Sequence, residues 1–273
     1  MYRYLLKRSV ADVKRCRDAG ASIVHLHARD KDGSASYQAE VYRELFTRVR
    51  FECPDILISA STSGRAFKEF SQRAQSLIAD PLIKPDFASL TLGSFNFPTQ
   101  ASINEPEMIR ALAERMAALG IVPEWECFEL GMIDFAKFLI EKEILVRPFY
   151  CNILLGSLGT LSASPHNLIS MVNQLPAGTT WSATGVGRYQ FTVNCLAISM
   201  GGHVRVGLED SLWYDEKKSK PATNAGLIER VAKVANSMER EIASPQEARQ
   251  IIGLPERDKL SKLALGTASN TGL

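Results

Sequence analysis

The sequence of 273 residues lacks several features that would point to particular classes of protein. No apolar run approaches membrane-spanning length, and the N-terminus has neither the long apolar core nor the small-residue cleavage site of a signal peptide. The formal net charge is only +2 and the basic residues are scattered, so there is no electrostatic footprint for nucleic acid. The five cysteines lie far apart without a Cys-x-x-Cys pair. We expect them to be reduced, mostly buried thiols of a cytoplasmic protein.

The sequence does contain a regular alternation of short apolar runs and longer amphipathic stretches. Strands are predicted at 22–28, 55–62, 86–93, 122–129, 147–155, 179–187 and 203–209. Helices are predicted at 9–19, 39–50, 105–119, 135–143, 165–174, 191–200 and 224–235. This alternation predicts a parallel sheet with crossover helices, and its spacing suits a (β/α)8 TIM barrel. No linker interrupts it, so residues 1–258 are predicted to form one domain, followed by a poorly ordered tail at 259–273.

The strand count is seven, although a barrel of this type normally closes with eight strands. The sequence opens on the predicted helix at 9–19, with no strand before it. We therefore expect an incomplete barrel with a gap between the strands at 22–28 and 203–209. A truncated or misassigned start that removes the first strand is the explanation that this count favours.

Two histidines lie two residues apart in the first predicted strand. Successive side chains of a strand point to opposite faces, so His25 and His27 project side by side. Two imidazoles at this spacing can bind one divalent metal ion, although a complete site needs further ligands. The alternative is a structural, hydrogen-bonded histidine pair at the end of a strand.

The last predicted strand offers a third ligand. Arg205, Gly207 and Glu209 share its inward face, and Gly207 leaves room beside the two charged side chains. Charged groups inside a barrel are costly unless they bind something. Glu209 could complete a site of two histidines and one carboxylate. The alternative is a buried Arg205–Glu209 ion pair without a metal.

Other polar side chains are predicted near the carboxyl ends of strands, where barrel enzymes place their active sites. One group is a hydroxyl-rich turn, which either binds a carboxylate or has only the structural role of a turn. The others are pairs of residues that share one face of a strand. These residues are Ser61 and Thr62 in the turn, and the pairs Ser89 with Thr91 and Glu124 with Glu126.

Five segments together resemble the β-keto acid cleavage enzymes, whose type activity is 3-keto-5-aminohexanoate cleavage. They are HLHARD at 25–30, STSGR at 61–65, LGSFNF at 92–97, WSATGVGR at 181–188 and GGHVRVGLED at 201–210. The resemblance runs in the same order from about residue 11 to residue 254, and it begins after the family's first strand. It implies a zinc-dependent (β/α)8 barrel that converts a β-keto acid and acetyl-CoA into acetoacetate and a new acyl-CoA. It also implies a homo-oligomer, commonly a tetramer.

The resemblance further implies roles for individual residues. The zinc ligands would be His25, His27 and Glu209; the catalytic residues Arg205, Asp210 and Glu126; and the substrate-binding residue Ser61. We add Thr62, Ser89 and Thr91 as further candidate substrate-binding hydroxyls. Candidates for the phosphates of coenzyme A are Arg65, Arg188, Lys217 and Lys218.

Two other interpretations stay open. Barrel hydrolases of the amidohydrolase type also carry a His-x-His pair, but they need further metal-binding histidines on later strands. Only His166 and His203 remain, one in a helix-entry loop and one at the start of a strand, so the sequence fits that class poorly. A non-catalytic barrel of the same family is the second alternative, and the missing first strand is the observation in its favour.

Overall fold

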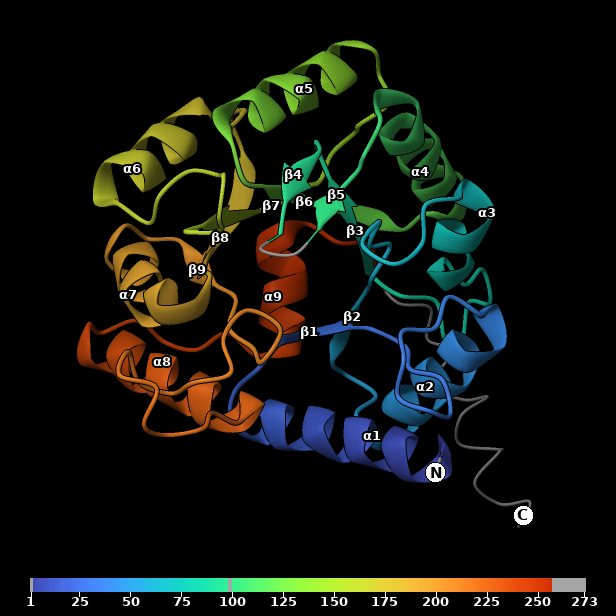
Figure 1. Cartoon of the computed structure of the whole chain (residues 1–273), viewed down its shortest axis with the longest axis horizontal. Helices are drawn as coiled ribbons and strands as arrows, with labels where there is room; N and C mark the ends of the chain where they lie inside the picture. Colours follow the sequence, from blue (N-terminus) through green and yellow to red (C-terminus); the bar gives the residue numbers. More distant parts are fainter. Residues whose placement is uncertain (1, 98–99, 257–273) are drawn as a thin grey trace.

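Seven parallel strands form one curled sheet in a computed structural model of the chain, which describes residues 2–97 and 100–256 (Figure 1). The order along the sheet is β1-β2-β3-β6-β7-β8-β9. The strands are β1 (Ile23–Leu26), β2 (Leu57–Ala60), β3 (Phe87–Thr91), β6 (Val122–Cys127), β7 (Phe149–Leu155), β8 (Thr179–Gly185) and β9 (His203–Val204). The predicted seven strands and their parallel order are confirmed. The fold is a half-closed TIM-type barrel.

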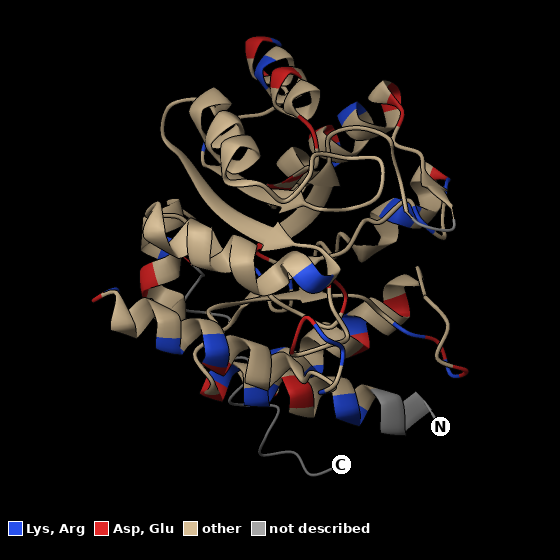
Figure 2. Cartoon of the chain, turned by 60° about the vertical axis from the view of Figure 1, so that its left-hand side comes forward, with Lys and Arg blue, Asp and Glu red and all other residues tan. Residues whose placement is uncertain are grey.

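Helices precede, connect and follow the strands of the sheet and cover its outer face (Figure 1). They are α1 (Tyr2–Asp18), α2 (Ala39–Glu52), α3 (Phe70–Arg73), α4 (Pro106–Leu119), α5 (Leu130–Glu141), α6 (Pro165–Gln174), α7 (Gln190–Ser199) and α8 (Asn224–Ser237), with 3-10 turns at Ala74–Ser76 and Gly187–Tyr189. Both signs of charge are interspersed along the helices in Figure 2. Among the described residues, none of the helices is long and apolar enough to cross a membrane.

The sheet does not close into a complete barrel. β1 and β9 are the two ends of the strand order, and in the described part of the chain no backbone pairing joins them. The predicted gap therefore lies where we expected it. The predicted strand at 203–209 is wrong beyond Val204: β9 pairs only through Ser182↔His203 and Ala183↔Val204. A strand is defined by its pairing with neighbours, and β9 has a neighbour on one side only, β8, with which it pairs through two residues.

The amino ends of the strands are closed by α9 (Pro245–Ile252), which lies at the centre of the barrel in Figure 1 and was not predicted. Its apolar side chains pack against the first residues of β2, β3 and β6. A buried ion cluster holds it there: Asp86 accepts hydrogen bonds from Arg50 Nη2 (2.7 Å) and Ile58 N (2.9 Å) and also pairs with Arg249 of α9. Burial would raise the pKa of Asp86, but the two guanidinium charges hold it below its usual value.

Glycines end helices in the left-handed conformation that only they adopt easily. Gly20 (φ 108°) and Gly120 (φ 61°) do so after α1 and α4. After α7 the left-handed residue is Gly201 (φ 82°). Gly202 is needed for space, because a Cβ there would overlap the ring of Trp181.

A small antiparallel hairpin, β4 (Phe95–Asn96) with β5 (Ala101–Ser102), also escaped prediction. It lies near the middle of the barrel in the view of Figure 1. Two-residue strands are too short to give a periodic pattern, so the sequence carries no strong signal for them. The predicted tail at 259–273 lies outside the described residues.

Candidate metal-binding and catalytic site

Three side chains converge at the carboxyl ends of β1 and β9, across the gap in the sheet. Ligating atoms of His25, His27 and Glu209 all lie within 4.8 Å of one another. The two Nε2 atoms are 3.1 Å apart, and Glu209 Oε1 is 3.0 Å from His27 Nε2. Tetrahedral ligands about 2.05 Å from a zinc ion would lie roughly 3.3 Å from one another. The spacing and chemistry of these donors therefore fit a divalent metal of the zinc type.

Glu124, on β6, lies next to the Nδ1 atom of His25. Its Oε2 lies 3.5 Å from His25 Nδ1 and accepts a hydrogen bond from Ser59 Oγ at 2.5 Å. Metal-binding imidazoles usually have such a carboxylate on their second nitrogen, which orients the ring. The sequence placed Glu124 only on the same face as Glu126. Its position behind His25 depends on the parallel register Ser59↔Phe87 and Ser89↔Glu124, which is a long-range property.

The charges around these residues set their protonation. Burial and the Arg205 charge would lower the pKa of His25, but Glu124 and Glu209 beside it raise the pKa above its usual value. Burial would likewise raise the pKa of Glu209, which His27 and Arg205 instead hold well below its usual range. Glu209 is therefore a carboxylate, which is the form that binds a cation.

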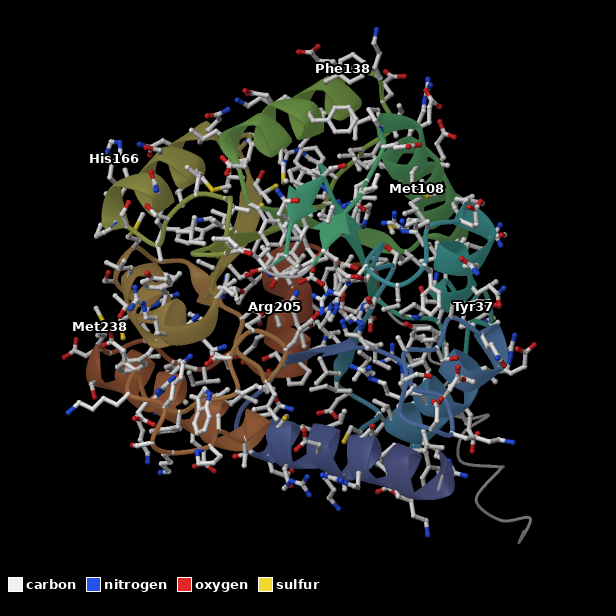
Figure 3. All side chains as sticks on the ribbon, viewed as in Figure 1. Tyr37, Met108, Phe138, His166, Arg205 and Met238 are labelled. Carbon is white, nitrogen blue, oxygen red and sulfur yellow. The ribbon has the colours of Figure 1, made fainter. Side chains whose placement is uncertain are left out.

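Arg205 lies at the centre of the molecule in Figure 3 and is surrounded by carboxylates. Its Nη1 is 3.0 Å from Glu126 Oε1, its Nη2 is 2.9 Å from Glu209 Oε2, and its Nε is 3.6 Å from Asp210 Oδ2. The Arg205–Glu209 ion pair exists together with the contact between Glu209 and His27. The two interpretations of Glu209 are therefore compatible in one arrangement, because its two oxygens serve different partners.

Asp210 is almost fully buried beside this arginine. Burial raises the pKa of its carboxyl to about 6, although the Arg205 charge opposes the rise. Its Oδ2 accepts no hydrogen bond from the described residues. A buried carboxylate whose Oδ2 accepts no hydrogen bond, next to a cluster of candidate metal ligands, is well placed to accept a proton from a bound molecule.

The four predicted hydroxyls divide into two groups. Ser61 and Thr62 line a cavity of about 370 Å³ next to His27 and Glu209. Ser89 accepts the Thr62 N–H bond at 3.1 Å and so supports that turn from behind. Thr91 Oγ1 donates to Glu126 Oε2 at 2.7 Å, on the opposite side of Arg205. Only Ser61 and Thr62 therefore border this cavity among the four.

The same cavity is bordered by three arginines, Arg29, Arg65 and Arg73. Arg65 lies 3.8 Å over the ring of Phe97, with its Nη2 4.0 Å from Glu209. Arg73 was not singled out in the sequence; it is buried and donates from Nε to Thr62 O at 2.8 Å. Burial lowers the pKa of Arg73 to about 10. Its wall position is a tertiary feature, because a short helix in a loop gives no periodic signal.

The other basic residues proposed for the phosphates of coenzyme A are exposed on the surface. Arg188 donates to Tyr189 Oη at 2.7 Å and is exposed, and Lys217 and Lys218 are exposed in the loop after Asp210. His166 lies on α6 at the periphery in Figure 3. The amidohydrolase interpretation, which needs further histidines near the metal, therefore has no support in the described residues.

Parallel strands, crossover helices and a polar cluster at the carboxyl ends of the strands define the class as a TIM-barrel-type enzyme. The sequence model of the β-keto acid cleavage enzymes matches residues 5–254, and the chain belongs to that family. It is 36% identical over 252 residues to the 3-keto-5-aminohexanoate cleavage enzyme of Fusobacterium nucleatum subsp. nucleatum, covering 92% of this chain and 90% of the relative.

A second relative agrees with this assignment, and a solved structure shares the fold. The chain is 30% identical over 256 residues to the 3-oxoadipate:acetyl-CoA acetyltransferase of Cupriavidus necator, covering 93% of this chain and 88% of that protein. The apo structure of ObcA superimposes with a TM-score of 0.81 at 20% identity, covering 91% of this chain and 64% of the ObcA chain. At that identity the likeness to ObcA supports the fold alone.

Proposed function

We propose that this chain is a zinc-dependent acyltransferase that acts on a β-keto acid and acetyl-CoA. The observation that carries the proposal is the convergence of His25, His27 and Glu209 next to the Arg205–Asp210 pair. In the reaction, the acyl group of the β-keto acid and the acetyl group of acetyl-CoA exchange places. The products are a new acyl-CoA and acetoacetate, so every atom of the two substrates is retained.

The three ligands would hold zinc through two imidazole nitrogens and one carboxylate. When bound, zinc supplies Lewis acidity toward the substrate's keto and carboxylate oxygens. Asp210 accepts the proton from the carbon between the keto and carboxylate groups at Oδ2, which accepts no hydrogen bond from the described residues. Arg205 orients Asp210 and Glu209 together. Glu126 and Thr91 hold the other side of the guanidinium group.

Substrate binding is assigned to the cavity beside His27. Ser61 and the backbone N–H groups of the turn that follows it would bind the substrate carboxylate. Thr62 and Ser89 support this turn rather than contacting substrate, because their hydroxyls and backbone bond to one another. Arg65, stacked on Phe97 at the border of the cavity, is our candidate for a coenzyme A phosphate.

The test is an assay of acyl-CoA and acetoacetate formation from acetyl-CoA and a panel of β-keto acids, with zinc measured in the same samples. We expect His27→Ala to lose both zinc and turnover. His166→Ala is the matched control, since this exposed imidazole lies far from the cluster, and it should keep both. Turnover that survives complete zinc removal, or zinc retained at full occupancy in His27→Ala, would contradict the assignment. Light scattering would test the predicted homo-oligomer.

A further inference from the structure

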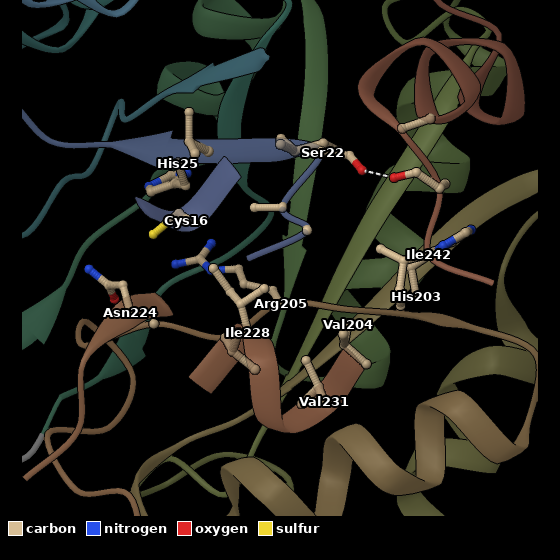
Figure 4. Close-up of a pocket in the computed structure, with 18 of the residues that line it drawn as sticks. Cys16, Ser22, His25, His203, Val204, Arg205, Asn224, Ile228, Val231 and Ile242 are labelled. Carbon is tan, nitrogen blue, oxygen red and sulfur yellow. Dashed lines mark hydrogen bonds between the residues drawn. The ribbon is translucent and has the colours of Figure 1, made fainter. Parts of the chain in front are cut away.

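The segment 205–210 carries three of the side chains to which the proposed function assigns a role, Arg205, Glu209 and Asp210. It is not held by the sheet, because the pairing of β9 with β8 ends at Val204 and no strand pairs with residues 205–210 in the described part of the chain. Figure 4 shows the side chain of Arg205 extending from this segment toward His25 of β1. Contacts outside the sheet must therefore fix the backbone on which these side chains stand.

Two buried side-chain amides of α7 bond to this backbone, and we call them the amide pair. Asn194 Nδ2 donates hydrogen bonds to Ala183 O at 3.0 Å and to Arg205 O at 3.2 Å, so it joins the segment to the neighbouring strand β8. Gln190 Nε2 donates to Gly207 O at 3.1 Å. Residues four positions apart lie on one face of a helix. The amide pair therefore presents its donors side by side along the segment.

The turn before α7 adds a contact at the far end of the segment. Gly187 N donates to Asp210 O at 2.7 Å. The turn folds back tightly on the end of β8, because a Cβ on Gly185 would lie only 2.2 Å from Tyr189 O. The start of α7 is thereby fixed against β8. Along the turn and the helix, positions 187, 190 and 194 bond to the carbonyl groups of 210, 207 and 205 in that order.

The amide pair is not what fold stability alone would favour. Gln190 and Asn194 are buried, and their side-chain carbonyl oxygens accept no hydrogen bond from the described residues. A buried polar atom without a partner is costly, and apolar side chains of the same size would avoid that cost. Gly207 O also accepts bonds from the backbone N–H groups of Asp210 and Ser211, so it does not depend on Gln190 for a partner. What the amide pair does determine is where the segment lies.

We propose that Gln190 and Asn194 are positioning residues for the proposed acyl transfer, on which this inference rests for its catalytic consequence. The amide pair holds the segment 205–210 so that Glu209 reaches His27 of β1, 3.0 Å away. It also holds the segment so that Arg205 and Asp210 face the same point. Neither amide contacts the metal-binding histidines, so both residues act through the backbone of the segment.

The test replaces each amide by an apolar side chain of similar size. Asn194→Leu and Gln190→Met remove the donors and keep the packing, and Asn194→Ala takes the place of the leucine variant if that variant does not fold. The matched controls are Asn167→Leu and Gln174→Met on α6. Their amides also donate to backbone carbonyl groups, but outside the cluster of metal-binding and catalytic residues.

Three measurements separate positioning from a merely structural role. In the metal-free full chain, hydrogen exchange should become faster at the amides of 205–211, while the melting temperature changes by less than about 4 °C. The dissociation constant for zinc should rise about 10- to 100-fold, the usual effect of removing a residue that orients metal ligands. At saturating zinc, kcat should fall by a similar factor while KM changes little, because the substrate carboxylate is assigned to the turn at 61–65. The α6 variants should show none of these effects.

Several results would overturn the proposal. Unchanged exchange at 205–211 in both variants would show that the amide pair does not hold the segment. Faster exchange over the whole chain, without an excess at 205–211, would make the amides structural only, as would a raised KM with an unchanged kcat or equal effects in the α6 controls. If the proposed enzymatic function fails, the unmodified protein itself forms no acyl-CoA. The exchange measurement needs neither zinc nor turnover, so the two failures are distinguishable.

Discussion

Replacement of Asp210 by asparagine separates the proposed proton transfer from metal binding. The substitution keeps the shape of the side chain and removes only its charge and its ability to accept a proton. Asp210 is 7% exposed and lies 3.6 Å from Arg205, which keeps its contacts with Glu126 and Glu209. The packing and the three metal-binding residues should therefore remain as they are.

The expected loss of turnover follows from the role of the group. A positioned general base contributes about 10²- to 10⁴-fold to the rate, so kcat/KM of Asp210→Asn should fall by that factor. Zinc content should stay near that of the unmodified protein. Asp215→Asn is the control, because in the described part of the chain this exposed carboxylate accepts hydrogen bonds from Ser219 and Lys220 of its own loop. It should keep its activity.

The same variant has an expected effect on stability. Burial raises the pKa of Asp210 from 3.8 to about 6, so ionisation at pH 8 costs the folded, metal-free protein up to roughly 3 kcal/mol. Asparagine carries no charge at any pH. The variant should therefore be more stable than the unmodified protein at pH 8, and this difference should shrink between pH 6 and pH 4 as Asp210 takes up its proton.

The measurements are acyl-CoA formation, zinc content and urea unfolding of the metal-free proteins at pH 8 and pH 4. Loss of zinc would make Asp210 a ligand instead of a base. Activity within tenfold of the unmodified protein would remove the assigned role. A variant less stable at pH 8 would refute the physical account of the buried carboxyl.

Further predictions concern stability. Asp86→Asn removes the counter-charge of two buried arginines and should lower the free energy of unfolding by about 3–5 kcal/mol in urea titrations, whereas Asp80→Asn breaks an exposed pair and should change it by less than about 1 kcal/mol. Because the folded-state pKa of Asp86 is lowered, its contribution should be full above about pH 4 and lost as the pH falls through the folded-state value; a constant difference at all pH values would contradict this. Gly202→Ala places a Cβ against Trp181 and should destabilise the protein by about 1–3 kcal/mol in thermal unfolding, and an unchanged melting temperature would show that the ring moves freely.

Local patterns in the sequence predicted the parts of the fold that depend on local physics. Periodicity of 2 or 3.6 is imposed by the backbone, so the seven strands and the main helices were predictable. Their ends were predicted less well: the error reaches seven residues at the start of α1, which begins at Tyr2 and not at residue 9. The pairing of His25 with His27 on one face has the same origin. The strand count against the eight of a closed barrel even located the gap, because order round a barrel follows order along the chain.

Only the tertiary structure decided which distant side chains meet. The register of β2, β3 and β6 places Glu124 behind His25, and the lack of a neighbour ends β9 at Val204. Arg73 and the helix α9 enter the barrel from segments with no strong periodic signal. These features depend on contacts between residues tens of positions apart, and a single sequence holds no local record of such contacts. The helices and strands can therefore be predicted from the sequence, whereas the partners of the buried charges are determined by tertiary packing.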